Sequence, residues 1–132
     1  MSDDIRDAVQ QWLAKAEMDW ASVEILSEHP RCPHPAVCFH CQQYVEKLLK
    51  AVLTRHGIEA PRTHDLRRLI QLASPSIADL DVLADRADQL SLSGVEIRYP
   101  DNWREVPENE MREMIALAEE FAAVILPRLI QK

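Results

Sequence analysis

Residues 35–56 constrain the fold more than any other segment, because the start, the end and the apolar spacing of this segment all indicate one helix. Pro35 suits the first helical position, where a missing N–H costs little, and Gly57 suits the position just past the last turn. Because successive residues are turned by about 100° around a helix, the apolar side chains fall on one side of it. They are Cys38, Cys41, Val45, Leu48, Leu49 and Val52.

The rest of the chain shows the same helical spacing of apolar residues and predicts an all-α protein. Such spacing runs over residues 4–28 and 77–93, and again from residue 108 to the C-terminus. With the helix at 35–56, these segments predict an antiparallel up-and-down four-helix bundle. An extra short helix is expected near 64–73.

Local signals predict where three of these helices begin or end. Thr63 is expected to be the N-cap of the short helix. Ser76, with Asp79 three residues later, is typical of a capping box and is expected to open the helix at 77–93. Pro127 is expected to kink or end the last helix, because proline removes a helical hydrogen bond.

Composition and charge argue against two classes of protein, those that coat nucleic acid and those that span a membrane. The net charge is −7, with 22 acidic and 15 basic residues, whereas a protein that coats nucleic acid usually presents a basic surface. No apolar run approaches the roughly 18 residues of a membrane span, and the first residues do not resemble a signal peptide. Three cysteines do not suggest a disulfide framework. We expect one helical domain, residues 1–132, in the reducing cytoplasm and not in a membrane.

Three cysteines and two histidines fall between Cys32 and Cys41, which raises the question of a metal site. Cys38 and Cys41 lie on the apolar side of the predicted helix, where a free cysteine packs as a small hydrophobic residue. His40 lies on the other side, and no second ligand pair follows downstream, as a zinc signature would need. We favour core packing over a metal site, and expect no cofactor other than a nucleotide ligand.

The other side of the helix at 35–56 is polar and carries His40, Gln43, Lys47 and Lys50. Two lysines, an amide and an imidazole at one-turn spacing suit an anionic or nucleotide ligand. The alternative is an ordinary helix face in contact with solvent.

Two loops carry further candidate nucleotide-binding residues. In "IRYPD", Arg98 can bind phosphate through two hydrogen bonds and Tyr99 can stack on a base, although a purely structural turn is equally consistent. In "PRTHDL", His64 joins the site only if it faces the polar side of the helix at 35–56. Otherwise it is an exposed residue at the start of the short helix.

Four stretches together resemble those of a known family. They are "WLAKAEMDWASVEILSE", "FHCQQYVEKLLKAVL", "GIEAPRTHDLRRLI" and "IRYPD", with Gln42-Gln43-x-x-Glu46-Lys47 and Thr-His-Asp-Leu as the more specific parts. Together they resemble the HEPN domain, the "higher eukaryotes and prokaryotes nucleotide-binding" family. The resemblance implies a helical bundle that often forms a homodimer, and a nucleotide ligand. It also implies a small nucleotidyltransferase as partner, frequently in a toxin–antitoxin module.

The resemblance also raises ribonuclease activity, because many HEPN proteins cleave RNA without a metal through an Arg-x4-6-His motif. Here Arg98 is followed by "YPDNWREVPENE", which contains no histidine. No imidazole therefore stands at the expected spacing to assist attack by the RNA 2′-hydroxyl. We expect a non-catalytic nucleotide-binding module with no catalytic residue.

Two alternatives stay open. One is a pure protein-interaction module, for which Trp12, Trp20 and Trp103 are candidate anchors, since aromatic residues often dominate interfaces. The other is a divergent ribonuclease, in which Arg98 works with His40 or His64 across a dimer interface.

Overall fold

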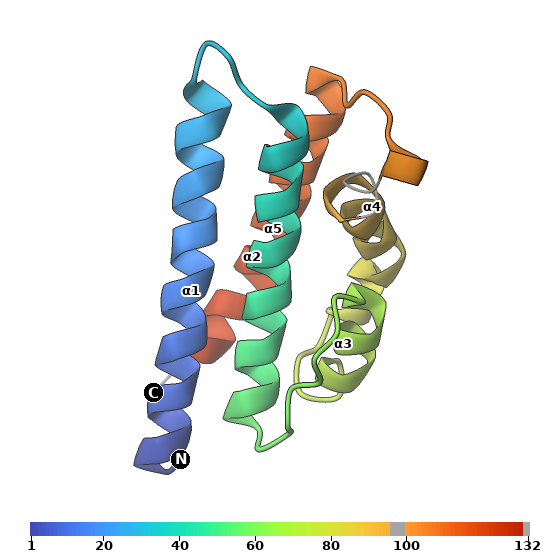
Figure 1. The fold of residues 1–132 in the computed structure, drawn as a ribbon. Helices are drawn as coiled ribbons and strands as arrows, with labels where there is room; N and C mark the ends of the chain where they lie inside the picture. Colours follow the sequence, from blue (N-terminus) through green and yellow to red (C-terminus); the bar gives the residue numbers. More distant parts are fainter. Residues whose placement is uncertain (96–99, 131–132) are drawn as a thin grey trace.

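All regular elements in the described part of the chain are helices (Figure 1). The computed structural model describes residues 1–95 and 100–130, and no strand occurs among them. None of their helices is both long enough and apolar enough to cross a membrane. These findings confirm the predicted all-α class. The elements are α1 (Asp3–Glu28), α2 (His34–Arg55), α3 (Leu66–Ala73), η1 (Asp81–Leu83), α4 (Ala84–Gly94), η3 (Pro100–Asn102) and α5 (Glu108–Leu129).

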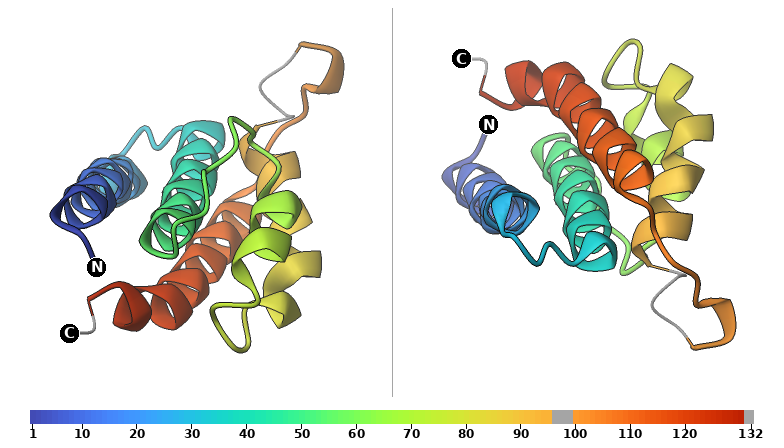
Figure 2. Two further views of the ribbon diagram at one scale, coloured as in Figure 1. Left: turned by 90° about the horizontal axis from the view of Figure 1, so that it is seen from below. Right: turned by 90° about the horizontal axis from the view of Figure 1, so that it is seen from above.

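Helix α2 lies at the centre of the fold, and α1, α3, α4 and α5 all pack against it. Figure 2 shows α1 on one side of α2, with α3 and α4 on the opposite side. The six apolar residues predicted to face the core are at most 1% exposed, and Val37, Ala51 and Leu53 are fully buried as well. Neighbouring helices therefore cover α2 around most of its circumference, including part of its polar side.

The predicted helix at 77–93 is the main difference between expectation and structure. Asp79 has a φ of +72°, in the left-handed region, so no capping box forms at Ser76. The chain instead passes through a turn and η1, and α4 begins only at Ala84. Ile77 and Leu80 on either side of Asp79 are buried, which indicates that core packing sets this path. In place of four long helices, the described residues hold three long and two short α-helices.

Two helix ends also differ from their local signals. Asp65 and not Thr63 caps α3: the Asp65 carboxylate accepts a hydrogen bond from the Arg68 N–H at 3.3 Å. The Thr63 hydroxyl accepts a hydrogen bond from the N–H of Asp65 itself, at 3.1 Å, and not from an N–H of the helix. Helix α5 continues past Pro127 to Leu129, so this proline does not end the helix.

The two glycines have different structural roles. Gly57 follows α2 with a φ of +72°, and a Cβ built there would meet nothing within 4 Å. Gly94, the last residue of α4, lies against α2. A Cβ at Gly94 would be 2.7 Å from the Cys38 carbonyl oxygen and 2.8 Å from the Gln42 Cβ. The absence of a side chain at Gly94 therefore lets the end of α4 approach the α2 backbone.

The substitution Gly94→Ala tests this close approach. We expect it to lower the free energy of unfolding by about 2 kcal/mol, because the added methyl group overlaps the α2 backbone despite the better helix propensity of alanine. Gly57→Ala is the matched control, with a cost of about 1 kcal/mol from the left-handed φ alone. Urea unfolding followed by circular dichroism measures both. A Gly94→Ala variant as stable as the unmodified protein would contradict the packing described here.

Candidate functional site

The side chain of Asp19 lies between α1 and α2 and binds two groups of α2. Its carboxylate side chain is 8% exposed. One oxygen is 2.8 Å from Nδ1 of His40, and the other accepts a hydrogen bond from Nζ of Lys47. His40 and Lys47 lie seven residues, about two helical turns, apart on α2. A single buried carboxylate thus joins α1 to two positions on the central helix that lie about two turns apart.

A second buried carboxylate, that of Glu46, joins α2 to the loop before α3. Its side chain is 5% exposed. It accepts a hydrogen bond from Nζ of Lys50 at 3.1 Å and from Nε2 of Gln42 at 3.2 Å, and lies 2.8 Å from Nδ1 of His64. The Gln42 amide also donates to the His64 carbonyl at 3.2 Å, and accepts from Gln43 at 2.8 Å. This network brings His64 to the polar side of α2, as its role in the site requires.

These contacts show what Lys47 and Lys50, two of the predicted nucleotide-binding residues, bind within the protein. Lys47 and Lys50 are each paired with a buried carboxylate, and the Lys50 ammonium also lies 5.6 Å from the centre of the Trp12 ring. Lys50 is only 8% exposed. The formal charges of two lysines and two carboxylates cancel, so this cluster offers little net attraction for phosphate. The helical phase of α2 did not show this, because Asp19 comes from another helix.

Both imidazoles of the cluster have one nitrogen fixed by a carboxylate. His40 contacts Asp19 through Nδ1, and His64 contacts Glu46 in the same way. A carboxylate at one ring nitrogen fixes the orientation of the ring and favours the tautomer with a proton on that nitrogen. The Nε2 atom of each ring is then available as an acceptor for a ligand, or as a base. The His64 side chain is 68% exposed, against 28% for His40.

A polar hollow adjoins His64. It has a volume of about 510 Å³ and lies between the loop before α3 and the helix α4. Two of its lining carboxylates are already engaged, since Asp65 caps α3 and Asp88 pairs with Arg67 at 2.8 Å. Among the described residues, its lining is Thr63, His64, Asp65, Asp88, Ser91 and Val95.

The predicted site residues Arg98 and Tyr99 lie outside the described residues, but both flanks of their segment bind one carboxylate. The Ser93 hydroxyl donates to Glu110 at 2.6 Å, and the Arg104 guanidinium donates to its two oxygens at 2.8 and 2.7 Å. Arg104, and to a smaller extent Ser93, lower the pKa of Glu110 against the opposing effect of burial. The chain on either side of Arg98 is therefore tied to the start of α5.

The cysteines and histidines near the start of α2 have different surroundings and do not share one site. Cys38 and Cys41 are fully buried, and burial raises the pKa of Cys38 to about 12 and that of Cys41 further. Cys32 lies 3.4 Å from the Met111 sulfur, and Nδ1 of His34 lies 2.8 Å from the Val106 carbonyl oxygen. Within residues 1–95 and 100–130, no three His, Cys, Asp or Glu side chains are arranged to hold a metal ion.

Three buried polar residues of the cluster, Asp19, Gln42 and Glu46, were not predicted as nucleotide-binding residues. The sequence nevertheless contains an indication of each. Asp19 lies three residues after Ala16 and four before Val23, so this acid belongs to the buried stripe of α1. Gln42 and Glu46 lie one turn apart on α2 and belong to the motif that carries the family resemblance. A polar or charged residue in phase with apolar neighbours was the signal that could have identified the cluster.

The described residues thus form an all-helical protein. Two buried carboxylates, those of Asp19 and Glu46, bind polar side chains of the central helix α2. A scan against protein-family models matches the HEPN domain over residues 9–129. This match begins within α1 and extends to the end of α5, so the chain belongs to the HEPN domain family. A search of curated proteins found no match, and a search of solved structures found none either.

The substitution Asp19→Ala tests the importance of the first carboxylate. We expect it to cost about 3 kcal/mol in unfolding free energy, because Lys47 is left partly buried without its partner. Adding Lys47→Met should recover part of this loss. Asp7→Ala, at an exposed site on the same helix, is the control and should change stability by less than about 0.5 kcal/mol. Equal stability of the Asp19→Ala and Asp7→Ala variants in urea would refute the assignment.

Proposed function

We propose that this HEPN-domain protein is a nucleotide-binding module that works in the cytoplasm with a small nucleotidyltransferase, as in a toxin–antitoxin pair. Family membership supports the broad class of nucleotide-binding or ribonuclease-like module. One observation supports a nucleotide site in this chain. An imidazole oriented by a buried carboxylate, that of His64 on Glu46, lies at a polar hollow large enough for a nucleoside.

The ion pairs change which groups we assign to which part of the nucleotide. Because Lys47 and Lys50 already hold carboxylates, we assign phosphate binding chiefly to Arg98. The imidazoles of His40 and His64, the Gln43 amide and the Tyr99 ring are assigned to the base and ribose. The lysines contribute indirectly, since they fix the carboxylates that orient the two imidazoles.

A divergent ribonuclease is the second candidate, and the same imidazoles favour it. Each carboxylate-bound imidazole resembles the base and its orienting acid in known hydrolases. Such an imidazole could take the proton of the RNA 2′-hydroxyl, while Arg98 stabilises charge on the phosphate. The sequence lacks a histidine at the family spacing after Arg98, so His40 or His64 would have to replace it.

Calorimetric titration of the protein with ATP and GTP tests nucleotide binding. We expect binding that weakens about tenfold in His64→Gln, through the loss of one oriented hydrogen bond, and also weakens in Arg98→Ala. Glutamine keeps a donor for Glu46, so the fold should survive. His56→Gln, at an exposed histidine, should bind as the unmodified protein does.

The absence of binding to either nucleotide would reject the nucleotide-binding proposal. Incubating the same proteins with RNA separates the second candidate. Cleavage that is lost in both His64→Gln and Arg98→Ala would favour the ribonuclease, whereas cleavage that persists in Arg98→Ala would indicate a contaminating enzyme.

The partner is tested separately by expressing the chain together with a nucleotidyltransferase encoded next to it. We expect the two to elute as one complex in size-exclusion chromatography with light scattering, and the chain alone to elute as a homodimer. A strict monomer that elutes apart from the nucleotidyltransferase would contradict both parts of the partner proposal.

A further inference from the structure

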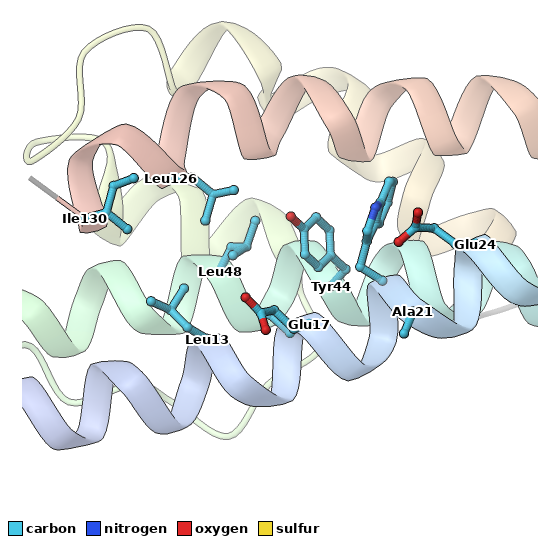
Figure 3. A pocket seen from close by; sticks show the side chains of 10 residues that line it. Leu13, Glu17, Ala21, Glu24, Tyr44, Leu48, Leu126 and Ile130 are labelled. Atoms are coloured by element: carbon cyan, nitrogen blue, oxygen red, sulfur yellow. The ribbon is translucent and has the colours of Figure 1, made fainter.

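A second surface, away from the polar cluster, forms a groove between α1 and α5. Both helices pack on α2, and the space between them has a volume of about 510 Å³ (Figure 3). Tyr44 and Leu48 of α2 form its floor, and Leu13 and Leu126 contribute apolar side chains from α1 and α5. Ile130, just after α5, lines one end and is 70% exposed. The groove therefore presents an uncovered apolar surface.

An aromatic pair marks the middle of this groove. The ring centres of Trp20 and Tyr44 are 4.7 Å apart. Both residues and Leu126 also line an adjoining hollow of about 390 Å³ on the α5 side, so the two spaces are continuous. Large aromatic residues in a concave, partly apolar surface are typical of positions that dominate binding energy.

The rim of the groove is acidic. Glu17 and Glu24 of α1 line it, with their carboxylates directed toward the space between α1 and α5 in Figure 3, and Glu119 of α5 lines the adjoining hollow. Among the described residues, none of these three acids forms an ion pair. Burial raises the pKa of Tyr44, and the negative charges of Glu17 and Glu119 raise it further, which places both acids near the aromatic floor.

We propose that the groove between α1 and α5 is a docking site for a basic amphipathic helix of a partner protein. Apolar side chains of that helix would fill the space over Tyr44 and Leu48, and its lysines or arginines would meet the three glutamates. From Leu13 to Glu24 the α1 side of the groove is about 17 Å long, which matches three turns of helix.

Charge favours this occupant over a second copy of the chain. A two-fold contact through the groove would place the same three unpaired acids against their own copies, in a protein whose net charge is already −7. A basic helix instead gains attraction at the same positions. The groove also differs from the nucleotide site in its residues, because α2 gives Tyr44 and Leu48 to one and Glu46 and Lys47 to the other.

Two synthetic helical peptides of about 15 residues test the proposal. Both carry leucines on one face at one-turn spacing, with flanking lysines in the first and glutamates in the second. Fluorescence anisotropy with the whole chain should show saturable binding of the lysine peptide and at least about tenfold weaker binding of the glutamate peptide. Failure of the lysine peptide to bind, or equal binding of both, would overturn the proposal.

Charge-reversed variants locate the binding site. Glu17→Lys with Glu24→Lys should weaken the lysine peptide about tenfold, through two attractions turned into repulsions. Glu59→Lys with Asp81→Lys changes the net charge equally at exposed positions outside the groove, and should bind nearly as the unmodified chain does. Equal loss in both double variants would show that net charge alone drives binding, and would refute the site.

The substitution Leu126→Arg distinguishes a second copy from a partner helix. It should abolish peptide binding, with folding checked by circular dichroism, and leave the oligomeric state in sedimentation unchanged. If it instead separates a dimer of the chain, a second copy occupies the groove and the proposal is wrong. The peptide experiments do not depend on the result of the nucleotide titration. The docking proposal can therefore fail while the proposed function holds, and the reverse is also true.

Discussion

The buried carboxylate of Asp19 is the contact on which the polar side of the molecule depends. A charge taken out of water is tolerated only when partners replace its hydration, and Asp19 has two, His40 and Lys47. These partners lie about two turns apart on α2, so the carboxylate fixes both the position and the rotation of α1 against the central helix. The same contact orients an imidazole and neutralises an ammonium group. Asp19 therefore serves both the packing of α1 on α2 and the orientation of His40, one of the proposed nucleotide-binding residues.

Glu46 extends this arrangement toward the loop before α3. Through Gln42 and His64 it ties a backbone carbonyl and an exposed ring to α2, while Lys50 balances its charge. In a low-dielectric setting, removing one member of such a network leaves the others with unmet hydrogen bonds. We therefore expect the two carboxylates to be less replaceable than the exposed groups that they orient.

Sequence periodicity predicted the helical class, the bounds of α2 to within about one residue, and the burial of Cys38 and Cys41. These features follow from one helix and its spacing. Sequence periodicity did not predict the turn at Asp79, because the burial of Ile77 and Leu80 outweighs the local capping signal. Nor could the phase of α2 alone reveal the pairing of Lys47, since the Asp19 carboxylate comes from 28 residues earlier in the chain. Contacts between elements decide which polar groups are free for a ligand.

The anchoring of Ser93 and Arg104 on Glu110 has a consequence for the segment between them. Both anchors bind the same carboxylate, so the ends of the segment that carries Arg98 are brought together by the folded helices. Joining the two ends of a chain segment costs entropy, by an amount that grows slowly with the length of the segment. Here that entropy is lost during folding. A ligand that engages Arg98 therefore meets a segment whose two flanks, Ser93 and Arg104, already have fixed positions.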